Sequence, residues 1–226
     1  NGDTYQELAG DLRVRSGELL EELRALCAEL GADPVLLSGN HDPGWPGSGW
    51  LELDGSRIVV THGDAVFWAG SPWGRERFSR EQEIERLWQA HREAGCEAGE
   101  RLRLAREIAR VLAPARLREG RSLSRRVLDA IDPPRRALEI LRVWWSQADA
   151  AAAFLERYFP AADTLVLGHF HRPGVWQRGG RLILNTGAFV SPQSARWVEW
   201  SDGLLRSGEV EEGRTFRRGR CLGVWR

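Results

Sequence analysis

Short apolar runs that end in polar, glycine-containing segments mark four places along the chain. The runs lie at 35–37, 57–60, 164–167 and 181–184, and each is followed directly by a polar loop sequence. Runs that are apolar on both faces are typical of strands buried in a layered α/β core. In such folds the functional groups gather in loops at the carboxyl ends of the strands. The pattern therefore predicts an α/β fold with its site in these four loops.

Helical periodicity covers most of the remaining chain. Leucines at 3–4 spacing predict a helix over 17–30, with Ser16 as its cap and Gly31 at its end. From about 75 to 159 the pattern is helical in about four segments, broken near 95–99, 114, 120 and 133–134. In the last segment one apolar stripe is predicted to be buried: Leu138, Leu141, Trp145, Ala148, Ala152 and Leu155. We interpret 75–159 as a helical insertion, or cap, within a single domain that spans 1–226.

The chain after residue 187 changes to short, Trp-rich, alternating segments. These lie at 197–200, 204–210 and 215–222 and predict antiparallel strands that close the sheet.

Length and charge narrow the class of protein. With 226 residues, the chain is long enough for one domain with an insertion. The 32 basic residues, all Arg, balance 32 acidic ones, so a nucleic-acid partner is not expected. Cys27, Cys96 and Cys221 show no C-x-x-C spacing and are interpreted as reduced thiols. No apolar run has the length of a membrane span.

The histidines carry the clearest chemical signal. Four of the five lie in the loops after predicted strands, and their loops also contain carboxylate and amide groups. Mixed oxygen and nitrogen donors suit a divalent transition metal such as Mn, Fe, Zn or Co. The candidate ligands are Asp3, Asn40, His41, His62, His169 and His171. His91 instead shares a helical stripe with Ile84, Leu87 and Trp88, so we interpret it as a packing or surface residue.

Four ordered motifs identify a family resemblance. The segments resemble motifs of the calcineurin-like metallophosphoesterases: Gly2-Asp3, Gly39-Asn40-His41-Asp42, His62-Gly63-Asp64 and Gly168-His169-Phe170-His171. The resemblance covers residues 1 to about 187. It implies a four-layer α/β/β/α sandwich with a dinuclear metal centre. The helical insertion weakly resembles members that act on lipid-linked or nucleotide-sugar pyrophosphates, such as UDP-2,3-diacylglucosamine pyrophosphatases. Those enzymes often carry Arg where this chain has His41.

The resemblance also implies roles for individual residues. Asp3 would bridge two divalent metal ions, and His171 would serve one of them. The other ion would be completed by Asn40, His62 and His169. His41 would protonate the leaving oxygen or stabilise the phosphoryl charge, and Asp42 would orient His41.

One motif of the family has no counterpart in the given residues. Its D-x-H motif would supply an Asp and a His to the second metal, and none precedes Asp3. The sequence contains no Met, not even at position 1. We therefore expect the first strand and its D-x-H motif to lie upstream of the given residues, and whether a leader peptide precedes them stays open.

Arginines near the motifs are candidates for substrate binding. Arg75 and Arg77 are the arginines of the insertion nearest the His62-Gly63-Asp64 motif, and Arg172 directly follows His171. A guanidinium suits bidentate phosphate contacts. The alternative is that such arginines belong to a solvated helical surface. Phe67, Trp68 and Trp73 likewise either line an acyl or base pocket or pack the insertion onto the core.

These observations favour a metal-dependent hydrolase that cleaves a phosphoester or pyrophosphate bond by attack of a metal-bridged hydroxide. The expected partner is a small phosphorylated substrate, with a nucleotide-sugar or lipid-linked pyrophosphate as the candidate class. The rival hypothesis is a catalytically inactive scaffold of the same fold that binds a protein partner. We expect a cytoplasmic protein, with peripheral association at the membrane as the alternative. The substrate, the native metals and the oligomeric state are left undecided.

Overall fold

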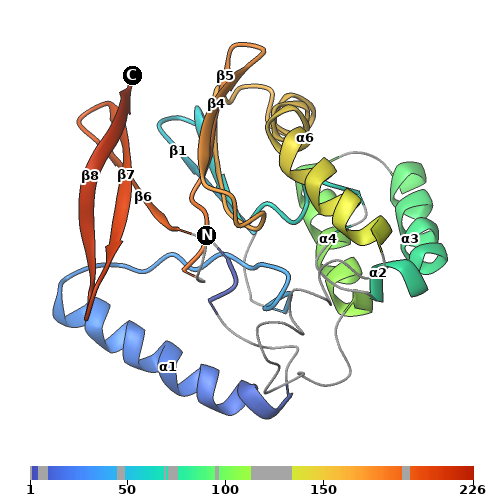
Figure 1. Cartoon of the computed structure of the whole chain (residues 1–226), viewed down its shortest axis with the longest axis horizontal. Coiled ribbons are helices and arrows are strands. Elements are labelled where there is room, and N and C mark those ends of the chain that lie inside the picture. Colours follow the sequence, from blue (N-terminus) through green and yellow to red (C-terminus); the bar gives the residue numbers. More distant parts are fainter. Residues whose placement is uncertain are drawn as a thin grey trace.

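The computed structural model describes residues 2–4, 10–44, 49–68, 70, 76–94, 97–112, 134–189 and 194–226. Its helices are α1 (Gly10–Glu29), α2 (Glu76–Ser79), α3 (Glu81–Ala94), α4 (Ala98–Leu112) and α6 (Pro134–Tyr158) (Figure 1). Its strands are β1 (Trp50–Leu53), β2 (Ile58–Thr61), β3 (Thr164–Leu167), β4 (Gly174–Arg178), β5 (Arg181–Asn185), β6 (Arg196–Ser201), β7 (Leu204–Glu212) and β8 (Phe216–Trp225). The predicted mixed α/β class is confirmed.

The larger sheet has five strands in the order β1-β2-β3-β5-β4. Its central strands β2, β3 and β5 are parallel and in register, with Val59 opposite Leu165 and Leu165 opposite Ile183. These are three of the four predicted strands. The prediction of a strand at 35–37 is wrong, because no strand of the described chain pairs with this segment.

The two edge strands of this sheet were not predicted. β1 pairs antiparallel with β2, and β4 pairs antiparallel with β5, so that each pair forms a hairpin. The hairpin signals are Asp54-Gly55 and Gly179-Gly180, all of which have positive φ angles. Positive φ at consecutive turn residues is what tight hairpin turns require, so these dipeptides could have revealed both strands.

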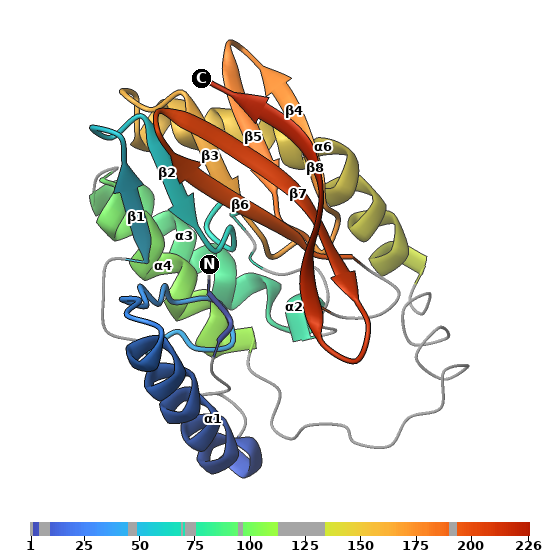
Figure 2. The same ribbon diagram turned by 90° about the vertical axis from the view of Figure 1, so that its left-hand side faces the viewer.

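The C-terminal strands form a sheet of their own, so the prediction that they close the first sheet is wrong. β6, β7 and β8 pair in that order, all antiparallel. The two sheets lie face to face (Figure 2). Leu205 of β7 packs there against Ile58, Val166, Leu182 and Leu184 of the larger sheet. Strands in which apolar and polar residues alternate have one apolar face, and the apolar face of this second sheet is buried against the first sheet.

Helices α4 and α6 cover the opposite face of the larger sheet. Their core residues Leu102 and Leu155 belong to one cluster with Val59, Leu165 and Ile183. The described residues therefore form α, β and β layers, and the fourth layer of the predicted sandwich stays a prediction.

Helix α1 begins earlier than predicted and is not a packed layer. It starts at Gly10, seven residues before the predicted start. Ser16 therefore lies within the helix and does not cap it, and Arg15 forms an ion pair with Glu18 there. Of its predicted stripe only Leu20 is buried, whereas Leu19 and Leu26 are exposed.

The predicted stripe of α6 is right only in its C-terminal half. Ala148 and Leu155 are buried, but Leu138, Leu141 and Trp145 are exposed. The reason is the direction of the face: Val143 and Gln147 are buried in the same part of the helix where Leu141 and Trp145 are exposed. The predicted stripe is therefore rotated away from the sheet there, and the buried face of α6 runs through Val143, Gln147, Ala151 and Leu155. No membrane-crossing helix is found among the described residues, since each helix there is too short or too polar for one.

The buried face of β3 should dominate stability. Leu165 has no exposed surface, so Leu165→Ala should lower the free energy of unfolding by about 2–5 kcal/mol, as other buried leucines do. Leu138→Ala is the matched control, because that side chain is 67% exposed and its loss should change stability by less than about 0.5 kcal/mol. Urea denaturation followed by circular dichroism measures both. Equal effects for the two variants would contradict the described packing.

Candidate active site

The three parallel strands bring their carboxyl ends to one edge of the sheet. His62 follows β2, Gly168 and His169 follow β3, and Asn185 ends β5. Backbone hydrogen bonds continue between these loops, from Gly168 N to His62 O at 2.9 Å and from Thr186 N to Leu167 O at 2.8 Å. The loops that carry the predicted residues are thus held side by side.

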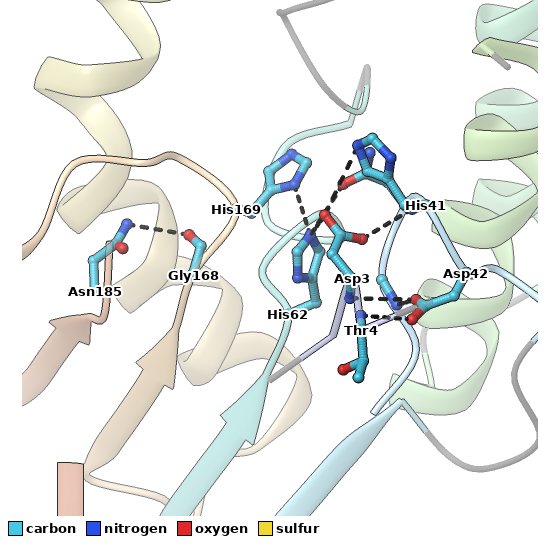
Figure 3. A network of polar contacts seen from close by, with 10 residues as sticks. Asp3, Thr4, His41, Asp42, His62, Gly168, His169 and Asn185 are labelled. Carbon is cyan, nitrogen blue, oxygen red and sulfur yellow. Dashed lines mark hydrogen bonds and ion pairs between the residues drawn. The ribbon is translucent and has the colours of Figure 1, made fainter. Parts of the chain in front are cut away.

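His62 lies at the centre of a cluster of polar atoms (Figure 3). Its Nε2 is 3.0 Å from Asn40 Oδ1, 3.0 Å from His169 Nδ1 and 3.2 Å from Asp3 Oδ2. A ring nitrogen carries at most one hydrogen, so it cannot form good hydrogen bonds to all three neighbours at once. Four of the predicted metal ligands therefore meet at one point, although they come from four separate segments.

Glycines make this close approach possible. A Cβ on Gly39 would lie 2.3 Å from Asp3 Oδ1, and one on Gly2 would lie 2.6 Å from His62 Cβ. Gly2 also has a φ of +86°, which a side chain would strain. The two glycines therefore allow the segment at 2–4 and the loop at 39–42 to lie against His62.

Asp42 ties the same two segments together. Its buried carboxylate accepts hydrogen bonds from the backbone amides of Thr4 at 2.9 Å, Asp3 at 3.3 Å and Gly39. A carboxylate that accepts several backbone N–H groups is well compensated for its burial. Asp42 thus fixes the loop that carries His41, while its direct orientation of the His41 ring stays a prediction.

His41 lies at the outer side of the cluster. Its backbone amide donates to Asp3 Oδ1 at 2.9 Å, and its Nε2 is 4.0 Å from Asp3 Oδ2. The side chain is 47% exposed, unlike that of His62, which is 4% exposed. His41 is therefore anchored through its backbone and open to a ligand through its ring.

Three of the predicted ligands have left-handed backbone conformations. The φ angles are +55° for Asp3, +62° for His169 and +55° for His171. The three other described non-glycine residues with positive φ are Asp54, Ser56 and Asp202 in turns. Such conformations are unfavourable for L-residues and concentrate at functional sites. The surrounding structure must therefore hold the backbone of these three residues in its unfavourable conformation.

The electrostatics of the cluster favour the protonation states of metal ligands. Burial alone would raise the pKa of Asp3, but the nearby His62 and His41 lower it well below its usual range. Burial, reinforced by repulsion from His62, lowers the pKa of His169 far below its usual value. Burial also lowers the pKa of His171, which the Asp3 carboxylate opposes. An ionised Asp and neutral imidazoles are the forms that bind metal ions.

The cluster is not a preformed metal site. No three His, Cys, Asp or Glu side chains of the described residues are placed as a group that could hold a metal ion. Instead, the donor atoms of Asn40 and His169 each lie at hydrogen-bonding distance from Nε2 of His62. The chemistry of the donor set fits Mn, Fe, Zn or Co, and the two metal ions stay a prediction.

A buried amide pair supports the loop after β3 from behind. Asn185 Nδ2 donates to Gln147 Oε1 at 2.8 Å and to Gly168 O at 3.2 Å, and its Oδ1 accepts from Gly187 N. Trp144 Nε1 donates to Phe170 O at 2.9 Å. Helix α6 thus contacts the segment that carries His169. Sequence reasoning missed Gln147, whose signal is a polar residue on the buried face of an amphipathic helix.

The three arginines predicted to bind substrate have different surroundings. Arg75 lies outside the described residues. Arg77 is mostly buried and forms an ion pair with Glu139 at 3.6 Å, within the insertion. Arg172 donates from Nη1 to Trp144 O at 3.2 Å and remains exposed. Their binding of substrate stays a prediction.

Phe67 and two residues of the insertion have packing roles. Phe67 packs edge-on against Phe170, with ring centroids 5.4 Å apart, and lies against the cluster in which α4 and α6 pack on the sheet. His91 is buried beside Trp88, in agreement with its interpretation as a packing residue. Arg101 of α4 was missed from the sequence: its Nη2 donates to Phe67 O at 2.8 Å, and burial lowers its pKa to about 10.

Comparison with known proteins gives one informative similarity. No family model matches the chain. The chain is 29% identical, over 224 residues, to a UDP-2,3-diacylglucosamine hydrolase from Ralstonia nicotianae. The similar region spans 91% of this chain and 75% of that protein. This chain is thus similar to a UDP-2,3-diacylglucosamine hydrolase over most of its length, which confirms the resemblance indicated by its motifs.

Proposed function

We propose that this protein is a metal-dependent hydrolase that cleaves a phosphoester or pyrophosphate bond. The observation that supports the proposal most directly is the meeting of Asp3, Asn40 and His169 around Nε2 of His62. The similarity to a named hydrolase supports the general class of reaction.

The same similarity suggests a class of substrate. The relative is named for UDP-2,3-diacylglucosamine, which joins a nucleoside diphosphate to an acylated sugar. We propose that this chain acts on a pyrophosphate of that kind, a nucleotide sugar with apolar chains.

The charge of the cluster supports a need for cations. Asp3 is an ionised carboxylate and the neighbouring His169 is neutral, and this pair of donors suits a cation. One ion would be held by Asp3, Asn40, His62 and His169, and a second by Asp3 and His171. Such ions, when bound, supply Lewis-acid stabilisation and lower the pKa of bound water.

His41 would handle the proton of the leaving group. Its ring is half exposed beside the cluster, and its backbone is held by Asp3. An imidazole is a suitable general acid near neutral pH. Asp42 contributes by fixing the loop at both Gly39 and Thr4, so that the His41 ring is presented to substrate from one position.

Metal binding should depend on the cluster. His62→Ala and His169→Ala should each weaken binding of Mn²⁺ by about tenfold or more, because each removes an imidazole donor. Isothermal titration of the chelator-treated protein measures the affinity. His91→Gln is the control, since it alters a buried His of α3 and should leave Mn²⁺ affinity unchanged. Equal affinity in the cluster variants and the control would exclude this metal site.

Loss of His41 should lower turnover much more than it lowers the affinity for Mn²⁺. In the Mn²⁺-loaded protein, His41→Ala should lower kcat by about 10²–10⁴-fold, the usual contribution of a general acid, while Mn²⁺ affinity stays near that of the wild type. Asn40→Ala should lower both. The assay uses bis(p-nitrophenyl) phosphate and UDP-2,3-diacylglucosamine. If both variants turned over like the wild type, the assigned roles would be wrong.

The assay also separates the enzyme from the scaffold hypothesis. Binding of Mn²⁺ without turnover of either substrate would support a scaffold that has lost catalysis.

A further inference from the structure

Helix α4 contacts the loop that carries Asn40 and His41. This helix belongs to the insertion and packs on the sheet through Leu102 and Ala105. In Figure 2 it lies beside the chain between α1 and β1. Two of its arginines, Arg106 and Arg110, are one helical turn apart and therefore point to the same side.

The two guanidinium groups contact opposite ends of the loop. Arg106 Nε donates to Ser38 Oγ at 3.1 Å, directly before Gly39. Arg110 Nη2 donates to Pro43 O at 3.3 Å, directly after Asp42. The four residues of the motif at 39–42 therefore lie between two contacts from one helix.

The surroundings of Arg106 indicate that this arrangement is specific. Two like charges at i and i+4 repel each other, so the helix itself gains nothing from the pair. Burial lowers the pKa of Arg106, whereas Asp64 and Asp42 favour its charged form. The two acceptors, Ser38 and Pro43, and the two carboxylates near Arg106 belong to loops that carry candidate ligands.

We propose that Arg106 and Arg110 are positioning residues, which hold the segment at 39–42 so that Asn40 and His41 face the cluster. The catalytic importance of this loop position rests on the proposed function. The two contacts themselves can be tested without an assay of enzyme activity. These contacts also link the insertion to the site, because a movement of α4 would be passed to this loop through two hydrogen bonds.

Hydrogen exchange tests the positioning directly. The amides of Gly39 and His41 donate to Asp42 and Asp3, so they should be protected in the wild type. Arg106→Ala and Arg110→Ala should speed exchange in a peptide that covers 38–43 by about tenfold or more, since each removes a hydrogen bond with a charged donor. Exchange in β3 should stay within about twofold, which shows that the core has not opened.

Two further variants serve as matched controls. Arg103→Ala removes an exposed arginine of the same helix that pairs only weakly with Glu100, so exchange at 38–43 should not change. Ser38→Ala removes the acceptor of Arg106 and should act like Arg106→Ala. The double variant of Ser38 and Arg106 should then be little worse than either alone, because both remove one contact.

Kinetics give the second readout. On bis(p-nitrophenyl) phosphate with Mn²⁺, Arg106→Ala should lower kcat by about tenfold and change KM by less than about threefold, as expected if His41 is misplaced and substrate binding is intact. Unchanged exchange at 38–43, or an equal rise in β3, would overturn the positioning role. If the wild type shows no turnover, the proposed function fails, and the exchange measurements alone decide the positioning role.

Discussion

Parallel pairing of β2, β3 and β5 is the constraint on which the candidate site depends. Parallel strands place their carboxyl ends at one edge, so His62, His169 and Asn185 meet there without any local sequence signal that joins them. β2 and β3 are separated by more than one hundred residues of chain, including α4 and α6, which then cover the outer face of the sheet. Helices within this connection contact the site loops through Arg106, Trp144 and Gln147.

Buried charge is handled locally in this protein. Asp42 is compensated by backbone amides, Asp3 by imidazoles, and Arg101 by a carbonyl and the face of Trp88. Because these partners are local, the zero net charge of the chain says little about the site.

The central strands and the grouping of the site residues could be predicted from the sequence, because both follow from one pattern: an apolar run that ends in a polar loop. The edge strands β1 and β4 were missed, since their residues are only half buried and the apolar pattern is weak there, although their turns carried a signal. The stripe on α6 failed at Leu141 and Trp145, because apolar residues such as Val143 lie at helical spacing on more than one face, and only packing against the sheet decides which face is buried. The supporting contact of Arg106 depends on tertiary packing and has no local signature, whereas Gln147 has the one signal of a polar residue on a buried helix face.

The left-handed conformations of Asp3, His169 and His171 set stability against function. Each non-glycine residue held in that region destabilises the fold by about 1–2 kcal/mol. Glycine at any of the three positions would relieve that strain and at the same time remove a candidate ligand. A search for more thermostable variants would therefore tend to select against these side chains, and positions where stability and chemistry disagree in this way can be recognised by measuring both in the same library.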